Sequence, residues 1–173
     1  MAANPVGYVS LEEYLTTEYE PDCDYVDGVL EDRNVGKQKH GETQLLLGAW
    51  LLSQRATHGK KPITEQRVRI SSGRVRIPDV CLIEPNDRDE TIQRPPALWV
   101  EILSPDDRFS RVARKLQEVL DFGVPTIWIV DPYDREAWIG TRDSGIVEAK
   151  DHVLRCPALR LEVKLEDVIP AAD

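Results

Sequence analysis

The 173-residue sequence has few cysteines and few histidines, three of each, and their placement argues against two kinds of site. The cysteines are odd in number and widely separated, so neither a disulfide framework nor a CxxC zinc site fits them. The histidines do not follow the HExxH spacing of a zinc enzyme. A stable metal site made only of Cys and His side chains is therefore not expected.

Long apolar runs are also missing. No run approaches the roughly 18 residues that a membrane span needs, and residues 1–5 carry neither the basic nor the apolar part of a signal peptide. With 41% hydrophobic and 31% charged residues, the chain is neither disordered nor fibrous. We expect a soluble cytoplasmic protein with no membrane partner, folded as a single domain over residues 1–173.

Basic residues are absent from the first 32 positions, which hold nine acidic residues and so account for the whole formal charge of −9. Residues 33–115, in contrast, carry 16 basic and 10 acidic residues, and residues 116–173 carry 6 and 12. The charge is therefore polarised along the chain. The acidic total does not exclude a polyanionic partner such as DNA.

Turn and capping signals define the N-terminal elements. Ser10 begins a capping-box pattern, which predicts a short helix over 11–18, and Asp27-Gly28 predicts the turn of a β hairpin. A longer helix is predicted over 37–57. Its expected buried face consists of Leu45, Leu46, Ala49, Trp50 and Leu52.

A strand–helix–strand unit follows further along the chain. Apolar runs at 98–103 and 127–130 flank a helix that begins at Ser104-Pro105. Such a unit predicts parallel strands joined by a right-handed crossover. With a hairpin over 66–83 and alternating segments after residue 132, the pattern predicts an α/β fold with a mixed sheet.

Two acidic residues interrupt predicted core strands. Alternation along a strand over 75–83 places Asp79 on an apolar face, and the same parity groups Glu101 with Trp99 and Leu103. Each acid alone has a structural explanation, a strand bend for the first or an arginine partner for the second. Because buried carboxylates are expensive, a pair on neighbouring strands favours a shared divalent cation.

Three further residues are candidates for the same cleft. Lys115 lies at the edge of the apolar stripe of its helix and can reach towards the strand of Glu101, or it extends its ammonium to solvent. Glu42 and His40 stand near the start of the long helix. They either face the cleft or form a solvated first turn.

A basic cluster lies between residues 55 and 76, where seven basic residues accompany one acid, Glu65. Such a cluster suits contacts with the phosphate backbone of DNA. The alternative is a solvated hairpin face. The seven residues are Arg55, Lys60, Lys61, Arg67, Arg69, Arg74 and Arg76.

Several segments occur in a characteristic order: Arg76–Val80, Val100–Pro105, Lys115, Gly123–Pro125 and Trp128–Pro132. In order and spacing, over residues 10–170, they resemble the Uma-type restriction endonuclease family of the PD-(D/E)XK nuclease superfamily. The Asp27-Gly28 turn, His40 and residues 64–66 match as well, although the sequence leaves the roles of His40 and Glu65 open.

This resemblance implies a restriction-endonuclease-like core over 37–131, in the order helix, hairpin, strand, helix, strand. An acidic helix and hairpin over 1–32 would precede the core, and a β extension over 132–173 would follow it. The implied activity is Mg²⁺-dependent hydrolysis of DNA phosphodiester bonds, with Mn²⁺ as a possible substitute.

The resemblance also implies roles for individual residues. Asp79, Glu101 and the main-chain carbonyl of Leu103 would hold the metal, which would activate a water molecule. Lys115 would orient that water or stabilise the charge on the phosphoryl group. Glu42, or less favourably Glu65, would add a further acid.

The sequence departs from the family pattern at three positions. Leu103 stands where the standard motif has its lysine, and in this family the following helix, here at Lys115, is thought to supply that lysine instead. Arg111 and Val119 stand where relatives often have Asp and Tyr. These departures support an alternative, a catalytically weak or inactive DNA-binding or protein-interaction module. Exposed edge strands make a homodimer plausible in either case.

Overall fold

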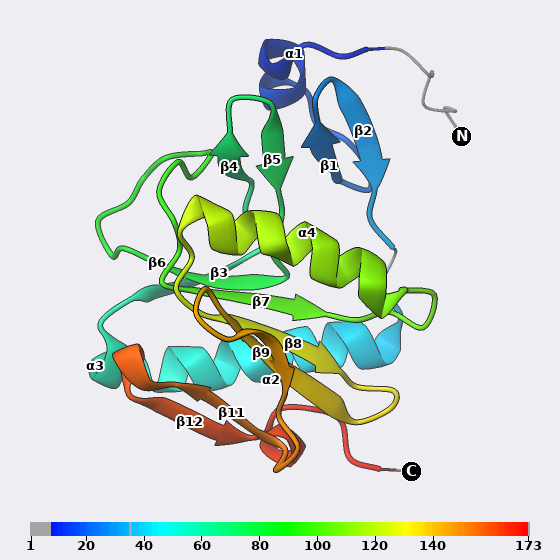
Figure 1. Cartoon of the computed structure of the whole chain (residues 1–173). Coiled ribbons are helices and arrows are strands. Elements are labelled where there is room, and N and C mark those ends of the chain that lie inside the picture. Colours follow the sequence, from blue (N-terminus) through cyan, green and yellow to red (C-terminus); the bar gives the residue numbers. More distant parts are fainter. Residues whose placement is uncertain (1–7, 35, 173) are drawn as a thin grey trace.

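A six-stranded mixed sheet forms the centre of the computed structural model, which describes residues 8–34 and 36–172 (Figure 1). The strand order is β10-β9-β8-β7-β6-β3, and only the central pair β7–β8 is parallel. Residues 1–5, where the sequence predicts no signal peptide, lie outside the described residues. The strands are β3 (Lys61–Thr64), β6 (Val80–Ile83), β7 (Leu98–Ile102), β8 (Ile127–Asp131), β9 (Glu136–Thr141) and β10 (Gly145–Glu148).

The predicted pair of parallel strands joined by a helix is confirmed, but the helix begins later than Ser104-Pro105. Residues 104–107 form a turn instead, in which the Ser104 amide donates to Asp107 Oδ2 at 2.7 Å and the Asp107 amide donates to the Ser104 carbonyl at 2.9 Å. Helix α4 (Phe109–Phe122) joins β7 to β8 and ends at Gly123, which adopts the left-handed conformation at φ 113°. The two strands are almost completely buried because helices or strands cover both faces of the sheet.

Different elements cover the two faces of this sheet. Helix α4 packs on one face, and helix α2 (Gln38–Ser53) packs on the other together with the C-terminal hairpin. The C-terminal part of the chain, where the sequence predicts a β extension, supplies strands β9 and β10 to the six-stranded sheet. It also supplies a hairpin to the layer that α2 forms on one face of this sheet. That layer includes α3 (Arg55–His58), β11 (Val153–Cys156), η1 (Pro157–Leu159), β12 (Leu161–Lys164) and η2 (Leu165–Asp167).

A second, four-stranded antiparallel sheet has the order β2-β1-β5-β4 and lies on the far side of α4 (Figure 1). Helix α1 (Leu11–Thr16) covers it, and the Ser10 hydroxyl accepts a hydrogen bond from the Glu13 amide at 3.1 Å, as the capping box predicts. Tyr14 is fully buried between helix and sheet. The strands are β1 (Cys23–Val26), β2 (Val29–Asp32), β4 (Val68–Ser71) and β5 (Arg74–Arg76).

The prediction of one continuous strand over 75–83 is wrong. Strand β5 belongs to the four-stranded sheet, whereas β6 belongs to the six-stranded sheet, and the chain changes sheets between Arg76 and Val80. Pro78 lies at this change because it has no amide hydrogen to donate to a strand ladder. The chain therefore carries Asp79 to the point where the two sheets meet.

The predicted buried face of α2 is also wrong. The buried positions are His40, Thr43, Leu47 and Leu51, whereas the Leu45 side chain is 71% exposed. Apolar residues occupy much of the circumference of this helix, so their periodicity did not identify one face. None of the helices within residues 8–34 and 36–172 combines the length and apolar character that a membrane span requires.

Candidate active site

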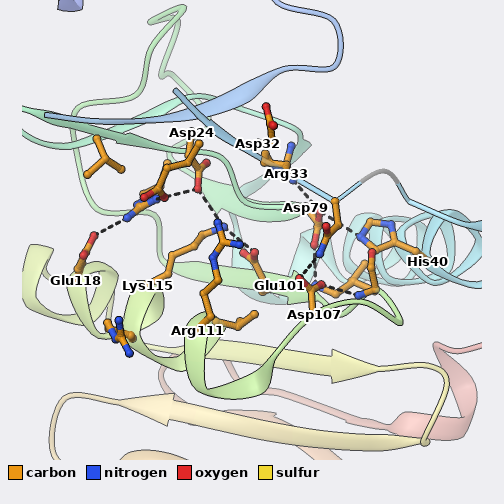
Figure 2. Close-up of a pocket in the computed structure, with 18 residues that line it drawn as sticks. Asp24, Asp32, Arg33, His40, Asp79, Glu101, Asp107, Arg111, Lys115 and Glu118 are labelled. Carbon is orange, nitrogen blue, oxygen red and sulfur yellow. Dashed lines mark hydrogen bonds and ion pairs between the residues drawn. The ribbon is translucent and has the colours of Figure 1, made fainter. Parts of the chain in front are cut away.

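A pocket of about 240 Å³ opens where the two sheets and α4 meet (Figure 2). Its walls come from the β1–β2 hairpin and the residues just after it, from β5, from Asp79 just before β6, from β7 and the loop that follows it, and from α2 and α4. It therefore combines segments that are far apart in the sequence. Asp79, Glu101 and Lys115 are all among the residues that line it.

Asp79 and Glu101 lie on the α4 side of the six-stranded sheet. Val80 pairs with Val100 in antiparallel register, and the Asp79 amide donates to the Val100 carbonyl at 3.2 Å, so the register places Asp79 opposite Glu101. Their strand neighbours Cys81 and Trp99 pack in the core beneath α4. Both acids are nearly buried, at 3% and 9% exposure, and they lie on the same face of the sheet, a point that the sequence left open.

The Asp79 carboxylate receives three donors. Its Oδ1 lies 2.9 Å from Arg33 Nη2 and 3.5 Å from His40 Nε2, and its Oδ2 accepts a hydrogen bond from the Ile102 amide at 2.6 Å. Burial alone would raise the pKa of Asp79, but the hydrogen bond with His40, the charge of Arg33 and the Ile102 amide together lower it. Asp79 is thus ionised at neutral pH.

Glu101 has different partners and the opposite shift. Its Oε1 accepts a hydrogen bond from Lys115 Nζ at 2.7 Å, and its Oε2 accepts one from Trp99 Nε1 at 3.2 Å. Burial and the negative charge of Asp79 raise the pKa of Glu101, because they outweigh the opposing effect of Lys115. The two acids are therefore not equivalent.

Lys115 contacts the pocket acids and does not simply extend to solvent. Besides Glu101, its ammonium group lies 3.4 Å from Asp24 Oδ2 (Figure 2). Burial would lower the pKa of Lys115, but these two carboxylates raise it above its ordinary value. The side chain is therefore a cation at neutral pH.

His40 and Glu65, whose roles the sequence left open, both connect to the Asp79 side of the pocket. Burial tends to lower the pKa of His40, but its hydrogen bond with Asp79 raises it overall. Glu65 forms an ion pair with Arg33 and accepts a hydrogen bond from Gln44 Nε2 at 2.8 Å. The same Gln44 group donates to the Asp79 carbonyl at 3.0 Å.

Glu42, the predicted further acid, does not line the pocket. It is exposed on α2, two residues after His40. Residues two apart on a helix point in divergent directions, about 200° around its axis, so the turn that directs His40 towards Asp79 directs Glu42 away. The structure thus separates Glu42 from the residues with which it was grouped.

Arg76, one of the seven predicted DNA contacts, is buried at 4% exposure. Its guanidinium contacts Asp24 at 3.1 Å, Glu31 at 2.7 Å and Glu118 at 3.0 Å. Its Nε is buried without a hydrogen-bond partner. Arg76 thus links the four-stranded sheet to α4 and has no free face for a phosphate group.

Other members of the basic cluster also have partners within the protein. Arg67 pairs with Asp22 at 2.8 Å, and Arg74 pairs with Glu118 at 2.7 Å. Lys60 pairs with Glu84 at 2.6 Å. Lys61 and Arg69 donate to main-chain carbonyls, and Arg55 is exposed.

Sequence reasoning missed Asp24 and Arg33, both from the hairpin region that precedes the expected core. Asp24 stood among nine N-terminal acids with no local pattern to distinguish it. Arg33 is the first basic residue after that acidic segment, and this position is the sequence feature that could have identified it as a candidate. Arg111 and Arg114 of α4 also line the pocket, and both are exposed.

The donor set of the pocket suits a hard cation only in part. Asp79 and Glu101 offer carboxylate oxygens, and Mg²⁺ is commonly held by one or two carboxylates with water completing its shell. Within the described residues, however, no group of three or more His, Cys, Asp or Glu side chains could hold a metal ion. Each carboxylate already has a cationic partner, so charge balance alone does not require a metal.

Comparison with known proteins adds an independent finding. Residues 11–169 match the family model Uma2, which is described as "Putative restriction endonuclease". The crystal structure of "a putative nuclease belonging to DUF820" from Anabaena variabilis superposes with a TM-score of 0.80 at 20% identity, covering 92% of this chain and 97% of that chain. A search of curated proteins finds no match. At this identity, the structural likeness shows the fold.

Proposed function

We propose that this protein, which belongs to the Uma2 family, hydrolyses DNA phosphodiester bonds in the pocket formed by Asp79, Glu101 and Lys115. The family and the restriction-endonuclease-like fold support a nuclease. The observation that carries the proposal is the pair of nearly buried carboxylates that lie opposite each other, one on β7 and one just before β6, with a lysine ammonium 2.7 Å from one of them.

Asp79 and Glu101 would hold the divalent ion, Mg²⁺ or Mn²⁺, with the main-chain carbonyl of Leu103 as a proposed third ligand. When bound, such an ion polarises the phosphodiester and lowers the pKa of a water molecule. Asp79 can offer Oδ1 only if Arg33, now 2.9 Å away, moves aside. Arg33 is therefore expected to compete with the ion.

Lys115 would stabilise negative charge on the phosphoryl group. Asp24 and Glu101 keep its ammonium protonated, so it is better suited to electrostatic stabilisation than to removing a proton from water. This favours one of the two roles that the family resemblance allows.

Contacts with the DNA backbone would come from exposed basic residues around the pocket. Arg111 and Arg114 line it and are exposed, which makes them stronger candidates than the buried Arg76. Of the seven residues predicted from the sequence, Arg55 is also exposed, but it lies on α3 and does not line the pocket. Such contacts weaken as salt increases because binding releases counterions from DNA.

One observation favours the alternative of a weak or inactive DNA-binding module. Arg33 and His40 already contact the Asp79 carboxylate, and Arg33 is itself held by Glu65. If this arrangement persists when DNA binds, Asp79 is not available to a metal ion. The protein would then bind without cleaving.

A plasmid-nicking assay with Mg²⁺ or Mn²⁺ tests the proposal. Wild type is expected to nick DNA only with metal, and Asp79→Ala and Lys115→Ala are each expected to abolish nicking. Glu148→Gln, at an exposed position on β10 outside the pocket lining, is the matched control and should retain activity.

The possible outcomes separate the two functions. Undiminished nicking by Asp79→Ala would refute the site, because no metal-dependent mechanism centred on Asp79 tolerates loss of its carboxylate. DNA binding by wild type without cleavage under either metal would favour the module.

A homodimer also stays a proposal. Strands β3 and β10 are the two edges of the six-stranded sheet, and the exposed Leu45 and Leu52 of α2 lie beside β3 in an apolar groove. Light scattering of wild type and Leu45→Ser would test it. A monomeric wild type would refute it.

A further inference from the structure

Asp24 is an acidic residue of the N-terminal hairpin that lies inside the pocket, next to Lys115 (Figure 2). It is 3% exposed and accepts contacts from three donors. Its Oδ2 lies 3.1 Å from Arg76 Nη1 and 3.4 Å from Lys115 Nζ, and its Oδ1 accepts a hydrogen bond from the Ile77 amide at 3.0 Å. The carboxylate is thus held in one orientation.

The position of Asp24 on β1 explains why its charge faces the pocket. Cys23 and Tyr25, its neighbours, pack with Tyr14 in the core beneath α1. Alternation along the strand therefore directs Asp24 to the opposite side, towards α4. A carboxylate buried here would destabilise the fold by several kcal/mol without cationic partners, and Arg76 and Lys115 are those partners.

Lys115 needs a second anchor for a physical reason. A lysine side chain is flexible, and its ammonium has no fixed donor geometry. Glu101 holds it at 2.7 Å, but Glu101 is also a proposed metal ligand. When its carboxylate turns towards a metal ion, its hold on the lysine weakens. Asp24 belongs to the four-stranded sheet and is not a proposed metal ligand, so it can keep its contact with Lys115.

We propose that Asp24 is a positioning residue that holds the Lys115 ammonium at the reacting phosphate while Glu101 serves the metal ion. This inference rests on the proposed nuclease function. It assigns part of the acidic N-terminal hairpin to the active site.

The Arg76 cluster supplies a matched control. Glu31 contacts Arg76 Nη1 at 2.7 Å, as Asp24 does at 3.1 Å. Within the described residues, however, the ion pairs of Lys115 are with Asp24 and Glu101. Loss of the Glu31 charge therefore perturbs the same cluster without removing an anchor of Lys115.

The first measurement does not depend on nuclease activity. Reductive methylation of the folded full-length protein, followed by peptide mass spectrometry, reports how readily Lys115 leaves its partners. In Asp24→Asn, which preserves side-chain size, Lys115 should be methylated about tenfold faster than in wild type, because a charge-assisted contact is lost. Glu31→Gln should match wild type within about twofold. A wild-type methylation rate in folded Asp24→Asn overturns the inference.

A second variant covers the case in which Asp24→Asn does not fold. Asp24→Asn combined with Arg76→Gln removes both partners of a buried ion pair, so no unpaired charge remains between them. Circular dichroism verifies folding. Faster methylation of Lys115 in this double variant supports the inference, and a wild-type rate overturns it.

The second measurement is kinetic and separates this inference from the proposed function. If wild type nicks DNA, Asp24→Asn should lower kcat about 10- to 100-fold with unchanged DNA affinity, since Asp24 would act only through Lys115. Unchanged kcat overturns the inference. If wild type does not nick DNA, the proposed function fails, and the methylation rates alone decide whether Asp24 anchors Lys115.

Discussion

The two faces of the six-stranded sheet use the same strands for different purposes. On the α2 face, residues such as Val80, Val100 and Trp128 form a fully buried apolar cluster. On the α4 face, the apolar cluster ends at the pocket, where Asp79 and Glu101 occupy positions that continue its rows. Consecutive residues of one strand, Val100 and Glu101, thus have opposite surroundings.

This difference shows where stability and chemistry are separated. The α2 face gains free energy from buried apolar area. The α4 face holds ions whose desolvation opposes their attraction, so such pairs are weak evidence for stability. We infer that the α2 face mainly stabilises the fold and that the polar end of the α4 face is retained for function.

The largest expected effect on stability comes from the α2 face. Trp128→Ala removes a fully buried ring and the hydrogen bond from its Nε1 to the Arg155 carbonyl at 2.9 Å. The free energy of unfolding, measured by urea denaturation, should fall by about 3–5 kcal/mol. Leu52→Ala, at a 57% exposed position, should change it by less than about 0.5 kcal/mol. A loss below about 1 kcal/mol for Trp128→Ala would contradict tight packing on this face.

Replacing the Glu101–Lys115 ion pair with apolar residues tests whether the ion pairs on the α4 face stabilise the fold. Glu101→Leu with Lys115→Met should leave the free energy of unfolding unchanged or raise it by about 1–4 kcal/mol, while metal-dependent nicking is lost. Lys115→Met alone should instead destabilise the fold, because Glu101 then lacks its cationic partner. Similar, large losses in the single and double variants would mean that this pair stabilises the fold.

Arg33, a cation from the N-terminal hairpin region, contacts the Asp79 carboxylate at the edge of the pocket. In Arg33→Ala, the affinity for Mn²⁺, measured by calorimetry, should rise about tenfold, since a competitor for Asp79 Oδ1 is removed. Arg111→Ala, which removes another basic side chain of the pocket lining, is the control and should change it little. Equal affinities in wild type and Arg33→Ala would show that Arg33 does not compete with the ion.

The smallest effects concern pH. The folded-state pKa of Asp79 is lowered, so its carboxylate contributes stability above its unfolded pKa of about 3.9, and this contribution is lost as pH falls through the folded value. The folded-state pKa of Glu101 is raised, so its ionisation reduces stability as pH rises through and above its unfolded value of about 4.3.

Urea denaturation over a pH series checks these signs. The stability advantage of wild type over Asp79→Asn should shrink as pH falls, whereas Glu101→Gln should gain relative to wild type as pH rises. Parallel pH profiles for the two variants would show that the acids do not differ as their surroundings indicate.

Much of the fold follows from local patterns. The Ser10 cap, the Asp27-Gly28 hairpin and the strand–helix–strand unit depend on residues close in sequence, and the structure contains all three. The start of the helix in that unit was predicted at Ser104-Pro105, whereas α4 begins at Phe109. The family resemblance is also confirmed, by the match over residues 11–169. Local patterns failed for α2, where several apolar arcs were available and only packing selected the arc with Leu47.

Alternation along a strand is a local property, so the sequence predicts which strand neighbours lie on the same side as Asp79 and which lie on the same side as Glu101. That the two acids share one face follows from the register of β6 against β7. Their partners depend on contacts between segments that are far apart in the sequence. Arg33 is 46 residues from Asp79 along the chain, and Asp24 meets Lys115 only because the two sheets enclose α4. No short-range periodicity encodes such contacts, since they depend on how separately formed layers pack together.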